Sequence, residues 1–330
     1  MQKRWVLRQA DEQHVAHLAS TLNVPPDIGR ILVHRGFSEP DAARRFLSSS
    51  LRADLPSPFL MAGMKEATER LRVALLESEK ICLWGDYDVD GTTGSSALVL
   101  FLRQLGADPV YYIPHRISEG YGISEEGIRQ LASSGVRLIV TVDCGISNAR
   151  EIGLARSLGM DVIVVDHHLP HGVLPPATAI LNPHRPECSF PDKGLAAAGL
   201  AFYLIMGLRA HLREAGWFAT RKEPDVRSFL DIITLGTIAD LVPLRGVNRV
   251  LTRRGLIELG RSSRPGILGL KKVAAIPPGE VGVGKVGFQL GPRINAAGRV
   301  DAAQKVVEML TTDSYETAWA IARQLDENNR

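Results

Sequence analysis

The sequence predicts an α/β protein in which a parallel sheet is flanked by helices and followed by a helical C-terminal extension. Between residues 81 and 165, short apolar runs alternate with helical segments of about ten residues, which is the pattern of βαβ units. Carboxylates and histidines come directly after several of these runs, so they are expected at one edge of the sheet. After residue 195 the apolar segments have helical length and spacing.

The elements are expected in the following order. Residues 1–60 contain short helical patterns interrupted by prolines and predict a small helical preamble. Strands are predicted over 81–84, 110–114, 137–142 and 161–165, and helices over 65–76, 93–105, 124–133 and 147–158. Further helices are predicted over 195–215, 226–239, 249–260, 301–311 and 314–328, with a glycine-rich basic stretch over 281–299.

The proposed domain division follows from this order. Residues 1–60 form the preamble, 61–265 the main α/β domain, and 266–330 a basic glycine-rich segment with connecting helices. The 330 residues carry a net charge of +3, which permits nucleic-acid binding without requiring it. The apolar runs stop well short of about 18 residues, and the N-terminus lacks an apolar signal core, so a cytoplasmic protein without a membrane span is expected. The three cysteines show no metal-like spacing.

Three carboxylates at alternate positions follow the first predicted strand: Asp86, Asp88 and Asp90. Carboxylates packed this closely repel one another unless cations hold them together. Taken alone, the pattern fits an acidic solvated turn as well as it fits a cation site. An EF-hand loop fits less well, because its twelfth position should be Glu and is Ala97 here.

Acidic residues directly after a predicted strand recur along the chain. Asp143 follows the third predicted strand, and Asp166, His167 and His168 follow the fourth. Asp240 ends an apolar helix, where a local hydrogen-bonding role is also open. Sites dominated by carboxylates with one or two imidazoles favour Mn²⁺ or Mg²⁺ over zinc. Two such ions roughly 3.5–4 Å apart can bind the attacking and leaving oxygens of a phosphoryl displacement.

These motifs resemble those of a known superfamily. Asp86-Tyr-Asp-Val-Asp-Gly91, Val142-Asp-Cys-Gly145, Asp166-His-His168 and Asp240 are similar to the successive motifs of the DHH phosphoesterases. The segments at 114–122, 199–203, 236–243 and 291–299 narrow the resemblance to the RecJ family of single-strand-specific 5′→3′ exonucleases. The resemblance covers roughly residues 60–330. It implies a DHH catalytic domain that hydrolyses single-stranded DNA in DNA repair and recombination.

The resemblance also implies roles for individual residues. Two divalent cations, Mn²⁺ or Mg²⁺, would be bound by Asp88, Asp90, Asp143, His167 and Asp240, with Asp143 bridging them. Asp86 would lie nearby as an acid, Asp166 would orient a histidine, and His168 would contact the scissile phosphate or protonate the leaving oxygen. Cys144 is expected to be a packed small residue. Substrate contacts are expected from Arg116, Tyr121, Arg293, Asn295 and Arg299.

Two other functions remain open. The chain could be another DHH phosphoesterase acting on pyrophosphate or short oligonucleotides, although the pyrophosphatases carry His where Trp84 stands. It could also be a non-catalytic scaffold derived from this fold, although such proteins lose ligand acids that are kept here. Single-stranded DNA is the expected partner, with a single-strand-binding protein as a second candidate. The resemblance further implies a longer protein with a second lobe, without which weak, non-processive and salt-sensitive cleavage is expected.

Overall fold

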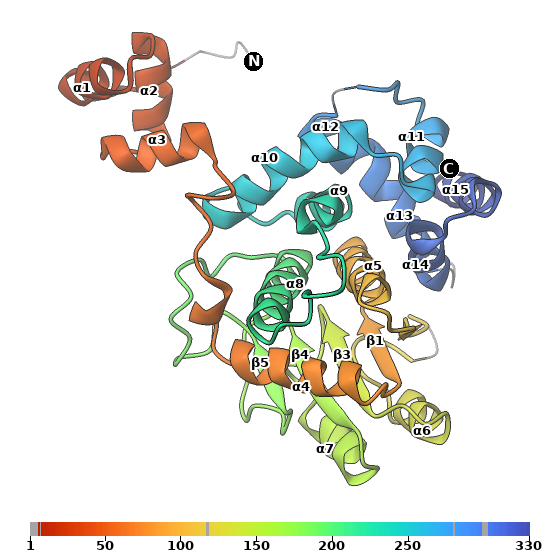
Figure 1. The fold of residues 1–330 in the computed structure, drawn as a ribbon. Helices are drawn as coiled ribbons and strands as arrows, with labels where there is room; N and C mark the ends of the chain where they lie inside the picture. Colours follow the sequence, from red (N-terminus) through yellow and green to blue (C-terminus); the bar gives the residue numbers. More distant parts are fainter. Residues whose placement is uncertain (1–5, 7, 117–118, 280, 299–302) are drawn as a thin grey trace. The chain divides into compact units, whose positions relative to one another are not determined.

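The computed structural model describes residues 6, 8–116, 119–279, 281–298 and 303–330. The chain divides into two compact units, Met1–Leu55 and Pro56–Arg330 (Figure 1). The described part of the first unit contains three helices, α1 (Glu12–Leu22), α2 (Pro26–His34) and α3 (Pro40–Ser48). They pack around the buried side chains of Leu18, Leu32 and Ala43.

The described part of the second unit contains a five-stranded parallel sheet with the order β2-β1-β3-β4-β5. Its strands are β1 (Ile81–Gly85), β2 (Val110–Tyr112), β3 (Leu138–Val142), β4 (Asp161–Val165) and β5 (Ala179–Leu181). The predicted fold class is confirmed. The sequence did not predict β5, because three apolar residues between prolines and polar loops carry no periodicity; the strand exists through its pairing with β4.

Helices cover both faces of the sheet and then continue into a helical region. Those of the α/β part are α4 (Met64–Leu76), α5 (Val89–Gln104), α6 (Glu125–Ser133), α7 (Ala149–Ser157) and α8 (Ala197–Glu214). Later come α9 (Leu230–Ala239), α10 (Gly246–Arg261), α11 (Pro265–Val273), α12 (Val283–Lys285), α13 (Gly291–Ala297), α14 (Ala303–Thr311) and α15 (Tyr315–Asn329). Short helices η1 (Pro58–Leu60), η2 (Val226–Phe229) and η3 (Val286–Leu290) complete the described set.

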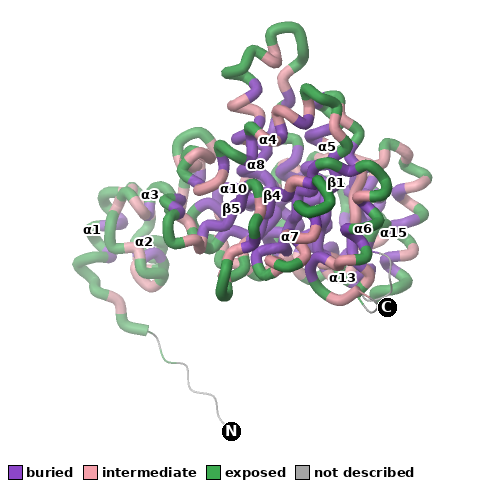
Figure 2. The backbone as a smooth tube through the Cα atoms, turned by 90° about the horizontal axis from the view of Figure 1, so that it is seen from below, coloured by how far each residue is buried: buried purple, intermediate pink, exposed green. Residues whose placement is uncertain are grey.

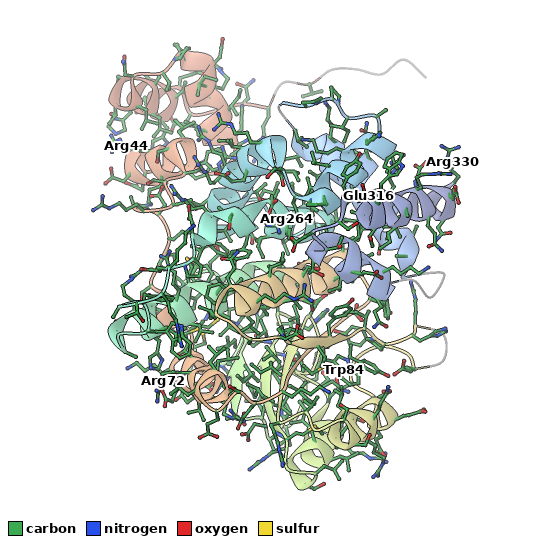
Figure 3. The ribbon with its side chains drawn as sticks, turned by 45° about the vertical axis from the view of Figure 1, so that its right-hand side comes forward. Arg44, Arg72, Trp84, Arg264, Glu316 and Arg330 are labelled. Carbon is green, nitrogen blue, oxygen red and sulfur yellow. The ribbon has the colours of Figure 1, made fainter. Side chains whose placement is uncertain are left out.

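The two faces of the sheet have separate cores. Helices α4, α5 and α8 lie on one face, and α6 and α7 lie on the other (Figure 1). Trp84 of β1 packs in the core on the α6 side (Figure 3). It stacks on Tyr112 at 4.2 Å between ring centroids and donates its indole N–H to the carbonyl oxygen of Gly122 at 3.2 Å. Strand β1 and helix α8 run through the buried interior, whereas exposed residues gather in the loops (Figure 2).

The glycine-rich stretch over 281–299 was expected as a basic segment without a predicted helix, and its described part is mostly helical. It contains α12, the π-helix η3 and α13. Val286, Leu290 and Ile294 recur every four residues and are buried, so this side of the segment packs against the core formed with α9 and α10. The predicted boundary at residue 265 lies inside the second unit, at the start of α11.

Helix α5 begins four residues before the predicted start at residue 93. The side chain of Asp88 accepts a hydrogen bond from the backbone N–H of Gly91 at 3.0 Å and so acts as the N-cap. Asp88 and Asp90 therefore lie in the cap and first turn of α5, and Asp86 precedes them in the loop after β1. Among the described helices, none is long and apolar enough to span a membrane.

Candidate metal centre and active site

The predicted acids and histidines lie at the carboxyl ends of the strands. Strand β1 leads into Asp86, β3 leads into Asp143, and β4 leads into Asp166. Asp240 approaches from the C-terminal end of α9, where it is the C-cap residue. Parallel neighbours in the order β1-β3-β4 bring these loops to a single edge of the sheet.

The predicted convergence of the ligand side chains is confirmed by their distances. His167 Nε2 lies 3.2 Å from Asp143 Oδ1 and 3.8 Å from Asp240 Oδ2. Three groups of side chains each have ligand atoms within 4.8 Å of one another. His167 belongs to two of these groups, and Asp143 also belongs to two. The groups are Asp143, His167 and His168; Asp90, His167 and Asp240; and Asp86, Asp88 and Asp143. Neighbouring three-ligand sets with shared members are what two adjacent cations require.

Asp90 is held by the start of a helix that is distant in sequence. Its carboxylate accepts hydrogen bonds from the backbone N–H groups of Ala197 at 2.6 Å and Ala198 at 2.9 Å. These are the first residues of α8, whose N-terminus carries partial positive charge. No motif in the sequence predicts this contact between Asp90 and α8. The only available signal was the run of small residues at the start of α8, which allows a close approach.

The carboxylates of the cluster lie close together, and hydrogen bonds do not satisfy all of their buried oxygen atoms. Burial and the charge of Asp88 together raise the pKa of Asp86 to about 7 and that of Asp240 to about 6. Burial also raises the pKa values of Asp90 and Asp143. Among the described side chains, buried oxygens of Asp86, Asp143 and Asp240 lack a hydrogen-bond partner. Buried oxygen atoms in this state fit divalent cations, which need oxygen ligands and neutralise the charge.

His167 and His168 have different surroundings. Burial and the charge of His168 lower the pKa of His167, which favours the neutral ring that binds metals. His168 Nδ1 donates to Asp166 Oδ1 at 2.8 Å, and this hydrogen bond raises the pKa of His168. Asp166 also accepts from the backbone N–H of Ile146 at 3.0 Å. The histidine that contacts Asp166 is thus His168, and the orienting role of Asp166 stays a prediction.

Tyr121 supports the same loops. Its hydroxyl donates to the backbone oxygen of Asp143 at 2.9 Å and lies 3.3 Å from His168 Nδ1. Its ring meets that of His168 edge to face at 5.8 Å. About half of the side chain stays exposed, which leaves room for the predicted contact with a base.

The other predicted substrate residues lie in different surroundings. Arg116 is exposed, with its guanidinium 5.1 Å from the ring centre of Tyr87. Arg293 donates to Asp326 at 2.8 Å and to the backbone oxygen of Gln289 at 2.7 Å, so it ties α13 to α15 and would have to leave these partners to bind a phosphate. Asn295 is exposed and lines a cavity beside Asp240. Arg299 lies outside the described residues. Cys144 is fully buried, as predicted.

Gly91 lets the acidic loop fold tightly. A Cβ at this position would lie 2.6 Å from the backbone nitrogen and oxygen of Asp86. We expect Gly91→Ala to lower the free energy of unfolding by about 1–3 kcal/mol and to weaken Mn²⁺ binding, because the loop must move. Thermal melting and Mn²⁺ titration measure both effects.

Gly153 provides the matched control for this substitution. It lies in α7, where an added Cβ meets only Pro176 at 3.9 Å. Gly153→Ala should therefore stabilise the protein by about 0.5–1 kcal/mol, as expected in a helix interior. If Gly91→Ala melts like the parent protein and binds Mn²⁺ equally well, the tight packing of Gly91 against Asp86 has no role in the site.

The chain is similar in sequence to a family model and to named proteins. Residues 80–237 match the family model described as DHH family, N-terminal domain. The single-stranded-DNA-specific exonuclease RecJ of Bacillus subtilis (strain 168) is 40% identical over 327 residues, which are 99% of this chain and 40% of that protein.

Two solved structures resemble the fold. The RecJ of Thermus thermophilus in complex with Mn²⁺ superposes with a TM-score of 0.81 at 32% identity, covering 98% of this chain and 44% of that one. A structure of exonuclease RecJ bound to manganese gives a TM-score of 0.72 at 36% identity, covering 84% of this chain and 67% of that one. The chain thus spans 40% of the curated Bacillus relative.

Proposed function

Because this chain belongs to the RecJ family of DHH proteins, we propose that its metal centre hydrolyses phosphodiester bonds of single-stranded DNA from the 5′ end. The observation that carries the proposal is the cluster of carboxylates around His167 and Asp143, in which buried oxygen atoms of Asp86, Asp143 and Asp240 lack a hydrogen-bond partner among the described residues. The similar protein of Bacillus subtilis is named a single-stranded-DNA-specific exonuclease. Two of the similar solved structures contain manganese.

We assign two divalent cations, Mn²⁺ or Mg²⁺, to Asp88, Asp90, Asp143, His167 and Asp240, with Asp86 beside them. Asp143 is the proposed bridge, since its carboxylate belongs to two of the three ligand groups and lies between the loops of β1 and β4. When bound, such ions neutralise the charge on a phosphodiester and lower the pKa of water. The strained backbone of Asp143, with φ of 66°, aims its carboxylate into the cluster.

His168 is the proposed general acid for the leaving oxygen. Asp166 holds Nδ1–H, which leaves Nε2 to face the substrate. The hydrogen bond from Nδ1 to Asp166 raises the pKa of His168, so the ring holds a proton more readily near neutral pH. Tyr121 limits rotation of the ring by contact with its edge.

Labelled substrates test this function. With Mn²⁺ or Mg²⁺, 5′-labelled single-stranded DNA should release labelled mononucleotide first, whereas 3′-labelled strands should shorten progressively. We expect His168→Ala to lower the rate by about 10²–10⁴-fold, as for loss of a general acid, and to retain metal. His171→Ala, which changes an exposed histidine of the same loop, should cleave at the parent rate.

Other outcomes of this experiment favour the remaining functions. Hydrolysis limited to dinucleotides or very short strands would favour an oligonucleotide phosphoesterase. Metal binding without hydrolysis of any strand would favour a scaffold protein. Release of the 3′ label first would contradict the proposed polarity.

We place this activity in DNA repair and recombination, in the cytoplasm. A single-strand-binding protein is a second candidate partner, since both proteins would occupy the same unpaired DNA. Co-sedimentation of the chain with such a protein on single-stranded DNA tests this association.

A further inference from the structure

A cavity of about 310 Å³ adjoins the metal centre on the side of Asp240. Val89, which stands between Asp88 and Asp90, forms part of its wall, as do Ala239 and Leu241 on either side of Asp240. The opposite wall comes from η3 and α13. These wall residues are the sequence neighbours of Asp88, Asp90 and Asp240. Neighbouring Cα atoms are about 3.8 Å apart, so the wall of the cavity lies close to these three carboxylates.

The lining is neutral and partly apolar. None of the described residues that line the cavity carries a charge, although a site for phosphate would call for basic groups. Its polar groups are the side-chain amides of asparagines, with Asn295 on the α13 side. Amides pair with the donors and acceptors at the edge of a nucleobase, and apolar walls cover its faces.

Two apolar side chains near this cavity are unusually exposed: Leu241, which lines it, and Phe288, which follows the lining residue Gly287 in sequence. Leu241 is 87% exposed and Phe288 is 86% exposed, which leaves both almost entirely in solvent. Leu241 has a left-handed backbone with φ of 62°, a strained conformation for leucine. Phe288 lies in the π-helix η3, next to the cavity residue Gly287. Strain and π-helices concentrate at functional sites, and exposed aromatic rings form stacking surfaces for single strands.

We propose that this cavity, with Leu241, Phe288 and Asn295, binds a nucleobase of the DNA strand whose phosphate lies at the metal centre. The inference rests on the proposed function, because it takes the strand to be the substrate of that centre. It accounts for preference for single strands: in a duplex the faces and pairing edges of the bases are occupied by neighbouring and complementary bases. In this proposal the cavity binds a base, whatever its identity, and the metal centre binds the phosphate.

The test compares strands with and without bases. Short oligonucleotides with phosphorothioate linkages, free at the 5′ end and fluorescent at the 3′ end, are titrated in Mg²⁺ and followed by anisotropy. One oligonucleotide carries bases and the other is fully abasic. We expect the parent chain to bind the base-bearing strand at least about tenfold more tightly, in line with base stacking.

Single substitutions then test which side chains cause the preference for the base-bearing strand. Phe288→Ala and Leu241→Gly should each weaken binding of the base-bearing strand by about five- to tenfold and leave abasic binding unchanged. Glycine tolerates the left-handed backbone at 241, so Leu241→Gly should melt no lower than the parent, which separates lost binding from lost folding. Leu76→Ala, at an exposed leucine ending α4, is the matched control and should bind both strands like the parent.

Equal binding of both strands by the parent would overturn the base site while leaving hydrolysis intact. Unchanged discrimination in both variants would also overturn it, as expected if a protein covers Leu241 and Phe288 instead. If the parent discriminates but does not hydrolyse an unmodified strand, the base site stands and the proposed nuclease function fails.

Discussion

Asp143→Asn should abolish metal binding and hydrolysis together. Asp143 joins two of the three ligand groups, and its Oδ1 is buried without a hydrogen-bond partner. A bridging carboxylate serves both ions, so its loss is expected to lower the rate of hydrolysis by about 10³-fold or more. Isothermal titration with Mn²⁺ measures the ions bound per chain, and digestion of labelled single-stranded DNA measures the rate.

Asparagine is chosen because it tolerates the left-handed backbone of Asp143 and keeps the shape of the side chain. The fold should therefore survive, with a far-ultraviolet circular dichroism spectrum like that of the parent. Asp313→Asn, which removes an exposed carboxylate elsewhere in the same unit, should retain both activities. A variant with two bound ions and near-parent activity would remove Asp143 from the proposed site.

Without metal, the protein should become less stable as the pH rises. Burial and the charge of Asp88 raise the folded-state pKa of Asp86 to about 7 and that of Asp240 to about 6, against 3.8 in the unfolded chain. A group with a raised folded-state pKa contributes stability that is present below the unfolded pKa and is lost as the pH passes through the folded pKa. In a chelator, we expect the melting temperature at pH 5.5 to exceed that at pH 8.5 by about 5 °C, which reflects on the order of 2–3 kcal/mol.

Saturating Mg²⁺ should remove most of this difference, because the ions bind the deprotonated carboxylates and stabilise them at the higher pH. Asp86→Asn should also reduce it in the chelator, whereas Asp108→Asn, at an exposed position, should not. A metal-free protein whose melting temperature is equal or higher at pH 8.5 would show that the carboxylates do not destabilise the empty cluster.

The strands that carry the metal centre, and the residue types at their ends, could be predicted from the sequence. β1, β3 and β4 are mostly apolar strands of five residues bounded by polar turns, so their composition and the βαβ order were enough to predict them. Parallel pairing places all three carboxyl ends at one edge, which is why the convergence of Asp88, Asp143 and His167 followed from their positions in the chain.

The tertiary structure decided the features that depend on contacts between distant segments. β5 forms only by pairing with β4, and the first turn of α5 is fixed by the cap at Asp88. Asp90 receives the N–H groups of Ala197 and Ala198, more than a hundred residues away, and no local pattern encodes such a contact.

Long-range packing likewise set the states of individual side chains. Arg293 is paired with Asp326 because α13 packs against α15, and Leu241 is exposed beside a cavity because α9 ends against η3. The residue types at the metal centre follow from the chain order, because strand ends meet by rule. Their burial, charge state and neighbours follow from packing, because these depend on which distant surfaces come together.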